Sequence, residues 1–186
     1  FNYLYTYRSA TGVDIAESCP YLAYFPVWIM WNWLPGPYPR EFGSGDVYHY
    51  RNDLWVYNLY THMSQIMDFY GASHPDCAAL AAYLRDSLPE NNRKYDWTWF
   101  FYPFLLTSVE KAPSPRKPAD TDLKARHFEA LGQVFMRSGV GPDDTYSLFT
   151  IGSQVPSHKQ YDENNFIIYK KGYLALDTGT RGLSTD

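Results

Sequence analysis

One stretch of the chain combines a histidine, an amide and carboxylates at a spacing that could support chemistry. Within residues 152–179 a polar run carries His158, Gln160 and Asp162, and Asp177 follows further along. Imidazole and carboxylate groups both ligate metals and transfer protons. The pattern is consistent with a metal or polar catalytic site, or else with an ordinary surface hairpin that has a polar rim.

Two predicted strands, residues 165–170 and 173–176, bring these side chains together. Gly172 lies between runs of β-branched and aromatic residues, which is a typical hairpin signal. A hairpin returns the chain to the end where it began, so we expect Asp177 to lie close to the polar run 158–162. The histidine, the amide and the carboxylates would then share one end of a sheet.

The composition bounds the class of protein. With 186 residues the chain can form one large domain or two small ones. Aromatic residues make up 19%, including 18 Tyr and 6 Trp, a proportion that suits either stacking on sugar rings or an aromatic-rich core. The net charge of −4 argues against nucleic-acid binding, and it means that a polyanionic ligand requires a local Lys/Arg cluster.

Cysteine usage and hydropathy narrow the class further. The two cysteines, Cys19 and Cys77, have no CxxC spacing, which argues against a zinc knuckle; a disulfide between them is neither indicated nor excluded. Prolines interrupt the most hydrophobic stretch, so no apolar run reaches the ~18 residues of a membrane span. The chain opens without an initiator methionine. We interpret it as an internal piece of a longer polypeptide whose remaining residues complete the fold and the site.

The first two thirds of the chain have the pattern of helices joined by short connections, which is typical of a bundle or a toroid of paired helices. Pro20 and Pro26 are expected to break the apolar stretch 14–33 into segments. Ser73 is a good N-cap for the helix that follows it, with Pro75 in the first turn. The further predicted helices are residues 54–70, 74–88 and 96–109.

Residues 113–125 are rich in proline and charge, and we interpret them as a linker. Residues 1–112 form the helical portion before it, and residues 126–186 read as successive strands separated by Gly, Pro and Asp turns. Helices followed by strands indicate an α+β protein rather than a βαβ fold, and four strands are too few to close a sandwich or barrel. The predicted strands are residues 126–138, 145–151, 165–170 and 173–176.

In this order the two portions resemble the heparinase II/III-like polysaccharide lyases, a family that pairs an incomplete α/α toroid with an antiparallel β-sandwich. The likeness covers most of the chain and is carried by three stretches. The first is FNYLYTYRSATGVD, which looks like the segment that bears the family's catalytic tyrosine. The second is ARHFEALGQVFMRSGVGPDDTYSLFTIG, which looks like the first strands of the sandwich. The third is SHKQYDENNFIIYKKGYLALDTGTR, which looks like the family's motif of two histidines, a Gly turn and a strand that ends on aspartate.

The third stretch can be matched to the family motif one residue at a time. His158 falls on the first histidine, which in these lyases points into the cleft and helps to handle the substrate uronate or the proton. Gln160 falls on the second histidine and Asp177 on the aspartate, both normally ligands of a structural zinc ion. A glutamine carbonyl is a poor zinc donor. Gln160 therefore leaves the zinc in doubt, and a metal-free hydrogen bond between Gln160 and Asp177 is the alternative.

Lyases of this family cleave a uronic-acid glycoside by β-elimination: a base removes the C5 proton and an acid protonates the leaving oxygen at C4. A tyrosine can serve as the acid, and as the base when its pKa is lowered. The resemblance places this role in the opening segment, where Tyr3 and Tyr7 share a helix face at i and i+4 while Tyr5 points elsewhere. We favour Tyr3 as the catalytic residue, then Tyr7; a simple packing stripe is the alternative.

The candidate substrate-binding residues are charged or imidazole side chains in loops. The stretch 34–46 is rich in Gly and Pro, and loops at one end of a toroid commonly line its cleft. Ordinary exposed side chains would give the same pattern. The candidates are Arg40, Glu41 and His49 in or beside this loop, and Lys159 beside His158.

Our leading hypothesis is a periplasmic or secreted bacterial polysaccharide lyase. Its partner would be an acidic polysaccharide or oligosaccharide, either heparin- or heparan-sulfate-like or alginate. Two alternatives are open. A glycoside hydrolase on the same toroid would need two opposed carboxylic acids, for which Glu41 and Asp46 are the nearest pair. A non-catalytic glycan-binding module would account for the departure at Gln160.

Overall fold

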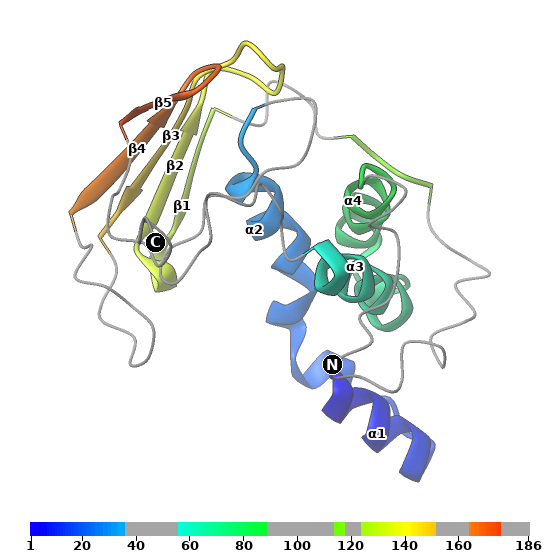
Figure 1. The fold of residues 1–186 in the computed structure, drawn as a ribbon. Helices are drawn as coiled ribbons and strands as arrows, with labels where there is room; N and C mark the ends of the chain where they lie inside the picture. Colours follow the sequence, from blue (N-terminus) through cyan, green and yellow to red (C-terminus); the bar gives the residue numbers. More distant parts are fainter. Residues whose placement is uncertain (36–55, 89–113, 118–123, 152–163, 176–186) are drawn as a thin grey trace, which may run out of the picture. The chain divides into compact units, whose positions relative to one another are not determined.

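The computed structural model describes residues 1–35, 56–88, 114–117, 124–151 and 164–175. Within these residues, four α-helices are followed by a five-stranded antiparallel open sheet, which confirms the predicted α+β class (Figure 1). The chain divides into two compact units, each described here by itself. The helical unit comprises Phe1–Met30 and Trp55–Lys117, and the strand unit comprises Trp31–Leu54 and Pro118–Asp186. The predicted linker, residues 113–125, is described only in part, and its role as a boundary stays a prediction.

Prolines punctuate the first third of the chain, as predicted. After α1 (Asn2–Thr11), a 3₁₀ turn (Ala16–Ser18) leads to a second 3₁₀ turn (Pro20–Tyr24) and then to α2 (Phe25–Asn32). Pro20 begins the second 3₁₀ turn, and Pro26 lies in the first turn of α2. Proline is tolerated at these positions because the first amides of a helix have no intrahelical acceptor.

The core of the helical unit lies between α3 (Val56–Tyr70) and α4 (Pro75–Asp86), which pack against each other. The face of α4 toward the core carries alanines, Ala78, Ala81 and Ala82, which are fully buried. Small side chains allow two helix axes to approach closely. The partner α3 contributes the large buried side chains Met63, Ile66 and Tyr70. The predicted helix over residues 96–109 lies outside the described residues.

The ends of α3 and α4 confirm one predicted helix signal and correct another. Gly71 follows α3, as expected, and a Cβ there would lie 2.5 Å from the carbonyl oxygen of Met67. The predicted N-cap of α4 was wrong: the cap is His74, and the hydroxyl of Ser73 pairs with the His74 ring at 2.9 Å. Pro75 occupies the first helical position. The helix therefore begins one residue later than it would if Ser73 were the cap.

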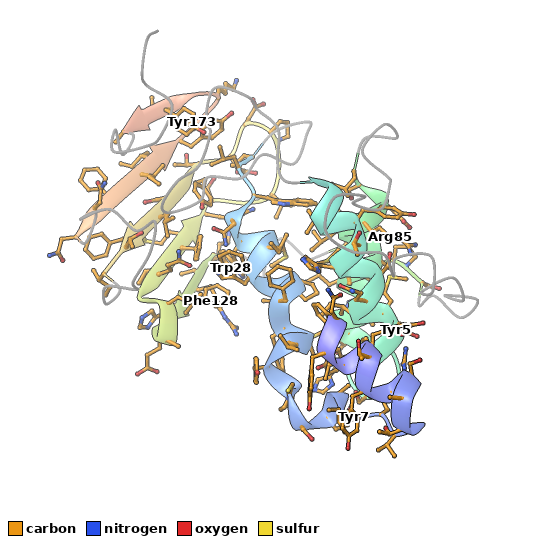
Figure 2. All side chains as sticks on the ribbon, turned by 60° about the horizontal axis from the view of Figure 1, so that its bottom comes forward. Tyr5, Tyr7, Trp28, Arg85, Phe128 and Tyr173 are labelled. Atoms are coloured by element: carbon orange, nitrogen blue, oxygen red, sulfur yellow. The ribbon has the colours of Figure 1, made fainter. Side chains whose placement is uncertain are left out.

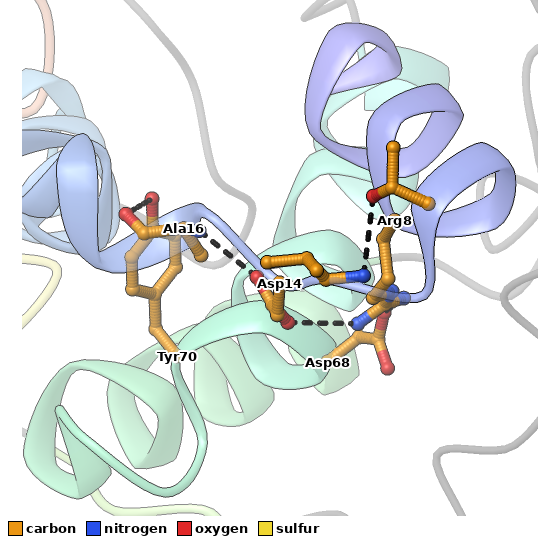
Figure 3. A network of polar contacts seen from close by, with 7 residues as sticks. Arg8, Asp14, Ala16, Asp68 and Tyr70 are labelled. Carbon is orange, nitrogen blue, oxygen red and sulfur yellow. Dashed lines mark hydrogen bonds and ion pairs between the residues drawn. The ribbon is translucent and has the colours of Figure 1, made fainter.

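A polar network ties α1 and the first 3₁₀ turn to α3 (Figure 3). The Arg8 guanidinium pairs with Asp68 of α3 and, at 3.3 Å, with Asp14, and it lies 4.2 Å from the ring centroid of Phe69. Asp14 in turn accepts a hydrogen bond from the Ala16 amide at 2.9 Å. Burial alone would lower the pKa of Arg8, but the two carboxylates outweigh it and raise the pKa. The network fixes how the chain leaves α1.

Tyr70 holds the other end of this connection. Its buried hydroxyl donates to the carbonyl oxygens of Ala16 at 3.1 Å and of Cys19 at 2.9 Å. Burial, followed by nearby negative groups, raises the pKa of Tyr70 to about 12. The neutral phenol is therefore the form that the fold favours.

We expect Tyr70→Phe to lower the free energy of unfolding by about 1–2 kcal/mol, because two carbonyl oxygens lose their donor while the ring still fills its place. The folded pKa lies above the unfolded value of about 10. The contribution of the phenol is therefore fully present below about pH 10 and is lost as the pH rises towards 12. Urea unfolding of both proteins at neutral pH and at about pH 12 would show the loss, and an unchanged midpoint at neutral pH would contradict it.

The sheet contains one strand more than predicted. Its order is β1 (Ala125–Phe128), β2 (Gln133–Arg137), β3 (Tyr146–Thr150), β4 (Asn165–Tyr169) and β5 (Tyr173–Ala175), each antiparallel to its neighbour. The single strand predicted over residues 126–138 was wrong. A 3₁₀ turn (Glu129–Leu131) and Gly132, with φ 59°, reverse the chain there and split it into β1 and β2. Glycine adopts this left-handed backbone without steric cost.

The predicted hairpin between β4 and β5 is confirmed, although its turn differs in detail. Lys171, not Gly172, takes the left-handed conformation, with φ 58°. The Lys170 amide donates to the carbonyl oxygen of Gly172 at 2.9 Å and closes the turn. Lys171 also pairs with Asp143 at 2.9 Å between exposed side chains.

Both faces of the sheet carry apolar side chains. One face, which we call the inner face, buries Phe135, Tyr146, Leu148, Ile167 and Tyr169. The opposite face, which we call the outer face, follows the alternate positions of the same strands, and two of its side chains are about half exposed: Met136 at 45% and Phe166 at 51%. The outer face carries Val134, Met136, Phe149, Phe166 and Ile168 on β2, β3 and β4.

The turn between β2 and β3 is built around one carboxylate. Asp144 accepts hydrogen bonds from the Ser138 hydroxyl and the Gly141 amide, both at 2.7 Å. The Ser138 hydroxyl also accepts a bond from the Thr145 amide at 2.9 Å. These bonds, led by the one from Ser138, lower the pKa of Asp144. The ionised carboxylate therefore closes the turn.

We expect Asp144→Asn to destabilise the protein at neutral pH, because the amide removes the charge that these donors stabilise. Since the pKa of Asp144 is lower in the folded state, its contribution is present above the unfolded value of about 4 and is lost as the pH falls through the folded value. The melting temperatures of the wild type and the variant should therefore converge in acid. A constant difference at every pH would contradict this account.

Candidate functional site

The two predicted catalytic tyrosines share one side of α1. The rings of Tyr3 and Tyr7 lie 6.0 Å apart between centroids, as the i and i+4 spacing predicted. Tyr5 packs instead against Phe69 of α3, with the ring edge turned towards it, and Figure 2 labels Tyr5 and Tyr7 on this helix. The packed side of α1 also carries Leu4, which is buried. Tyr3 and Tyr7 are therefore on the side that does not pack against α3.

Exposure separates the two candidates. Tyr3 is 68% exposed, so a core packing role does not account for it. Tyr7 is only half-buried, and its carbonyl oxygen accepts a hydrogen bond from the Thr11 hydroxyl at 2.7 Å. A phenol that exchanges a proton with a ligand must be reachable from solvent. On this measure Tyr3 is the better-placed side chain.

The strands that flank the predicted histidine motif are well defined. β3 ends at Thr150 and β4 begins at Asn165, and the Asn164 amide donates to the Thr150 carbonyl at 2.8 Å. β5 runs antiparallel to β4, with Ala175 opposite Ile168. The last described residue of the hairpin thus runs back along β4, as the sequence predicted. The motif residues themselves lie outside the described residues: His158, Lys159, Gln160 and Asp177.

The other predicted ligands of the glycan, Arg40, Glu41 and His49, also lie outside the described residues. Their roles stay predictions, as does the pairing of Tyr3 with His158. Within the described ranges, no three His, Cys, Asp or Glu side chains lie close enough to hold a metal ion. Both cysteines are free thiols, and burial raises the pKa of Cys77.

One buried charge was not anticipated. Arg137, at the end of β2, donates to the carbonyl oxygen of Trp31 at 2.9 Å and also to that of Trp33. Its guanidinium lies over two aromatic rings, 5.5 Å from the centroid of Trp31 and 5.1 Å from that of Tyr146. Burial lowers the pKa of Arg137 to about 10, so the group keeps its positive charge at neutral pH.

Within the strand unit, this arginine attaches the segment that carries Trp31 and Trp33 to the inner face of the sheet. The last carbonyl groups of a helix lack intrahelical donors and carry partial negative charge, which a cation satisfies. The signal was present in the sequence: Gln133, Phe135 and Arg137 alternate on one face of a strand, and Phe135 marks that face as the core. Arg137 anchors the segment that leads towards residues 36–55.

No helix in the described part of the chain is long and apolar enough to cross a membrane.

Comparisons with known proteins give little further guidance. No protein-family model matches the chain. No curated protein matches it either. Among solved structures, the chain is similar to a mutant of the heparan sulfate lyase HepC from Pedobacter heparinus, with a TM-score of 0.32 and 11% sequence identity. The match covers 85% of this chain and 28% of that one, so the chain spans less than a third of that lyase. The likeness is a weak structural resemblance to a polysaccharide lyase.

Proposed function

We propose that this chain belongs to a polysaccharide lyase that cleaves uronic-acid-containing glycans by β-elimination. The observation that carries the proposal is the exposed Tyr3 phenol, which shares one side of α1 with Tyr7. It stands beside the order of helices followed by an antiparallel sheet and the motif stretch 157–181. A glycan outside the cell suits a periplasmic or secreted bacterial enzyme.

The proposed chemistry assigns roles to groups of this chain. Tyr3 exchanges the proton at C5 of the uronate or at the leaving oxygen on C4. His158 handles the uronate or the same proton. Arg40, His49 and Lys159 neutralise the uronate carboxylate, which increases the acidity of the C5 proton, and Glu41 contacts the sugar. Charge neutralisation of this kind is commonly the largest part of such a rate enhancement.

A structural zinc ion does not fit the donors that this chain offers. Gln160 presents an amide oxygen where the family has an imidazole, and Asp177 supplies one carboxylate. Zinc sites are built from thiolate, imidazole and carboxylate ligands. We therefore assign Gln160 and Asp177 a hydrogen bond that holds the loop, and no step of the reaction runs through a metal.

The reaction class can be tested directly with the intact polypeptide that carries this chain. Elimination forms a double bond in the uronate, and the product absorbs ultraviolet light. The substrates to test are heparin, heparan sulfate, chondroitin sulfate, hyaluronan and alginate, and we expect such a product from at least one of them. If none of the five glycans yielded an ultraviolet-absorbing product, the lyase proposal would be wrong. A His158→Ala variant with full activity would remove that imidazole from the mechanism.

A non-catalytic glycan-binding module is the second candidate, and a specific observation favours it. Three tyrosines of the helical unit are largely exposed: Tyr3, Tyr21 and Tyr24. Exposed tyrosine rings suit stacking on sugars whether or not a reaction follows. Binding without any product would support the module. New reducing ends without ultraviolet absorbance would instead support a glycoside hydrolase, for which Glu41 and Asp46 are the candidate carboxylic acids.

A further inference from the structure

Helix α1 depends on a neighbouring helix for its position. It has 10 residues, and Leu4 is its buried side chain. An isolated helix shorter than about 12–15 residues is only marginally stable in water. The orientation of α1, and with it the direction in which the Tyr3 phenol points, is therefore set by the side chains that reach α3.

Phe69 of α3 is the residue on which α1 packs, and it is itself buried. The Phe1 ring stacks on it at 6.4 Å between centroids, and the Tyr5 ring meets it edge-on at the same distance. The Arg8 guanidinium lies 4.2 Å from the Phe69 centroid. Positions 1, 5 and 8 recur at helical spacing and define the packed face of α1. Tyr3 falls on the opposite side of the helix, where it is exposed.

Arg8 makes the directional contacts of the packed face (Figure 3). Its guanidinium pairs with Asp68, the neighbour of Phe69 on α3, and with Asp14, which follows the end of α1, at 3.3 Å. A planar guanidinium donates along fixed directions, which adds geometric specificity to an ion pair. Because its partners lie on two separate segments, this group fixes the rotation of α1 about its own axis.

Small rotations of α1 matter for chemistry at Tyr3. Side-chain tips lie about 5–6 Å from the axis of a helix, so a rotation of about 10° displaces them by about 1 Å. Misplacing a reacting group by about 1 Å can lower a rate on the order of 10²-fold. A residue on the packed face can therefore control the rate without any contact with the glycan.

We propose that Arg8 is a positioning residue, which holds α1 on α3 in the rotation that presents the Tyr3 phenol to the glycan. This role rests on the proposed function in one respect, that Tyr3 transfers a proton. Arg8 acts through the helix, because its guanidinium is held by two carboxylates and by the ring of Phe69 on the side away from Tyr3.

Steady-state kinetics of Arg8→Met in the intact polypeptide test this role. The substrate is the glycan, of the five named above, from which the wild type forms ultraviolet-absorbing product fastest. We expect kcat to fall about 10–100-fold and KM to stay unchanged, because the groups proposed to hold the uronate lie elsewhere in the chain. Such a split marks an interaction that counts only in the transition state. Rates are measured well below the midpoints of thermal unfolding of both proteins.

Arg85→Met is the matched control. Arg85 of α4 makes the same two kinds of contact, an ion pair with Asp86 at 3.0 Å and a contact with the Tyr60 ring at 5.9 Å from its centroid. Its loss removes a comparable guanidinium from a helix that carries no proposed catalytic group. Both kcat and KM should stay at their wild-type values.

A double-mutant cycle with Tyr3→Phe separates positioning from a general effect on folding. If Arg8 acts through the Tyr3 phenol, Arg8→Met should cause no further loss of kcat once that phenol is gone. A general effect would lower kcat by the same factor in both backgrounds. Arg8→Lys keeps a positive charge beside Asp68 but not the planar group over Phe69, so its kcat should lie between those of the wild type and Arg8→Met. It replaces Arg8→Met in the cycle if that variant does not fold.

The outcomes distinguish this role from the proposed function. An unchanged kcat in Arg8→Met, a raised KM, or an equal loss in both backgrounds would overturn the positioning role and leave the lyase standing. Full activity of Tyr3→Phe would remove the phenol that Arg8 is proposed to position, and the role with it. If the wild type forms no ultraviolet-absorbing product from any of the glycans, the proposed function is wrong and Arg8 has no reaction to serve.

Discussion

Replacing Tyr3 with phenylalanine should lower the turnover rate on a uronate-containing glycan by about 10²–10⁴-fold, the usual contribution of a positioned acid or base. The substitution removes only the phenolic oxygen. Because the Tyr3 side chain is 68% exposed, the fold should be unaffected. The rate at which the ultraviolet-absorbing product forms checks this expectation. The two proteins should have the same midpoint of thermal unfolding.

Tyr5→Phe is the matched control for this substitution. It removes the same atom from the same helix, two residues away, on the side that packs against Phe69. Its activity should match the wild type, whereas Tyr7→Phe should affect the rate only if the neighbouring ring takes part. Full activity of the Tyr3→Phe protein would show that this phenol transfers no proton, and the reaction would then need another donor.

Replacing Arg137 with methionine should lower the free energy of unfolding by about 2–4 kcal/mol. The variant leaves the carbonyl oxygens of Trp31 and Trp33 without their donor and removes a cation from two aromatic faces. Methionine has a similar length and keeps most of the apolar contact. Guanidinium unfolding followed by tryptophan fluorescence would measure the loss.

Two further variants interpret that loss. Arg126→Met, on the neighbouring strand β1, removes an exposed arginine and should change stability by less than about 0.5 kcal/mol. Arg137→Lys should recover only part of the loss, because an ammonium group is more strongly hydrated than a guanidinium and cannot lie flat over the rings of Trp31 and Tyr146. If Arg137→Met were as stable as the wild type, the cost of burying the charge would cancel its contacts, as is known for some buried ions.

The sequence predicted the elements whose signals are local. The tyrosine pair of α1, the proline at the start of α4 and the β4–β5 hairpin all follow from spacing within a few residues. The chain reversal at Gly132 was not predicted, because this glycine lies inside an apolar run that has the pattern of one continuous strand. Only its left-handed backbone, which composition does not reveal, makes it a reversal.

The part of the site that depends on distant contacts was harder to predict. Arg137 shares a strand face with Phe135, which marks it as buried, but this pattern does not show what its guanidinium binds. Its partners are carbonyl groups of the backbone more than a hundred positions earlier in the sequence, and backbone acceptors leave no mark on a residue pattern. The motif residues His158, Gln160 and Asp177 show the converse: their signal is clear in the sequence, and their geometry is still a prediction.

The outer face of the sheet, where Met136 and Phe166 are about half exposed, affects the solubility of this polypeptide. A nonpolar surface of this kind attracts any other nonpolar surface that it meets, including vessel walls, detergent tails and a second molecule of its own kind. Clear solutions at low concentration should therefore turn cloudy on concentrating, and a mild nonionic detergent should keep them clear.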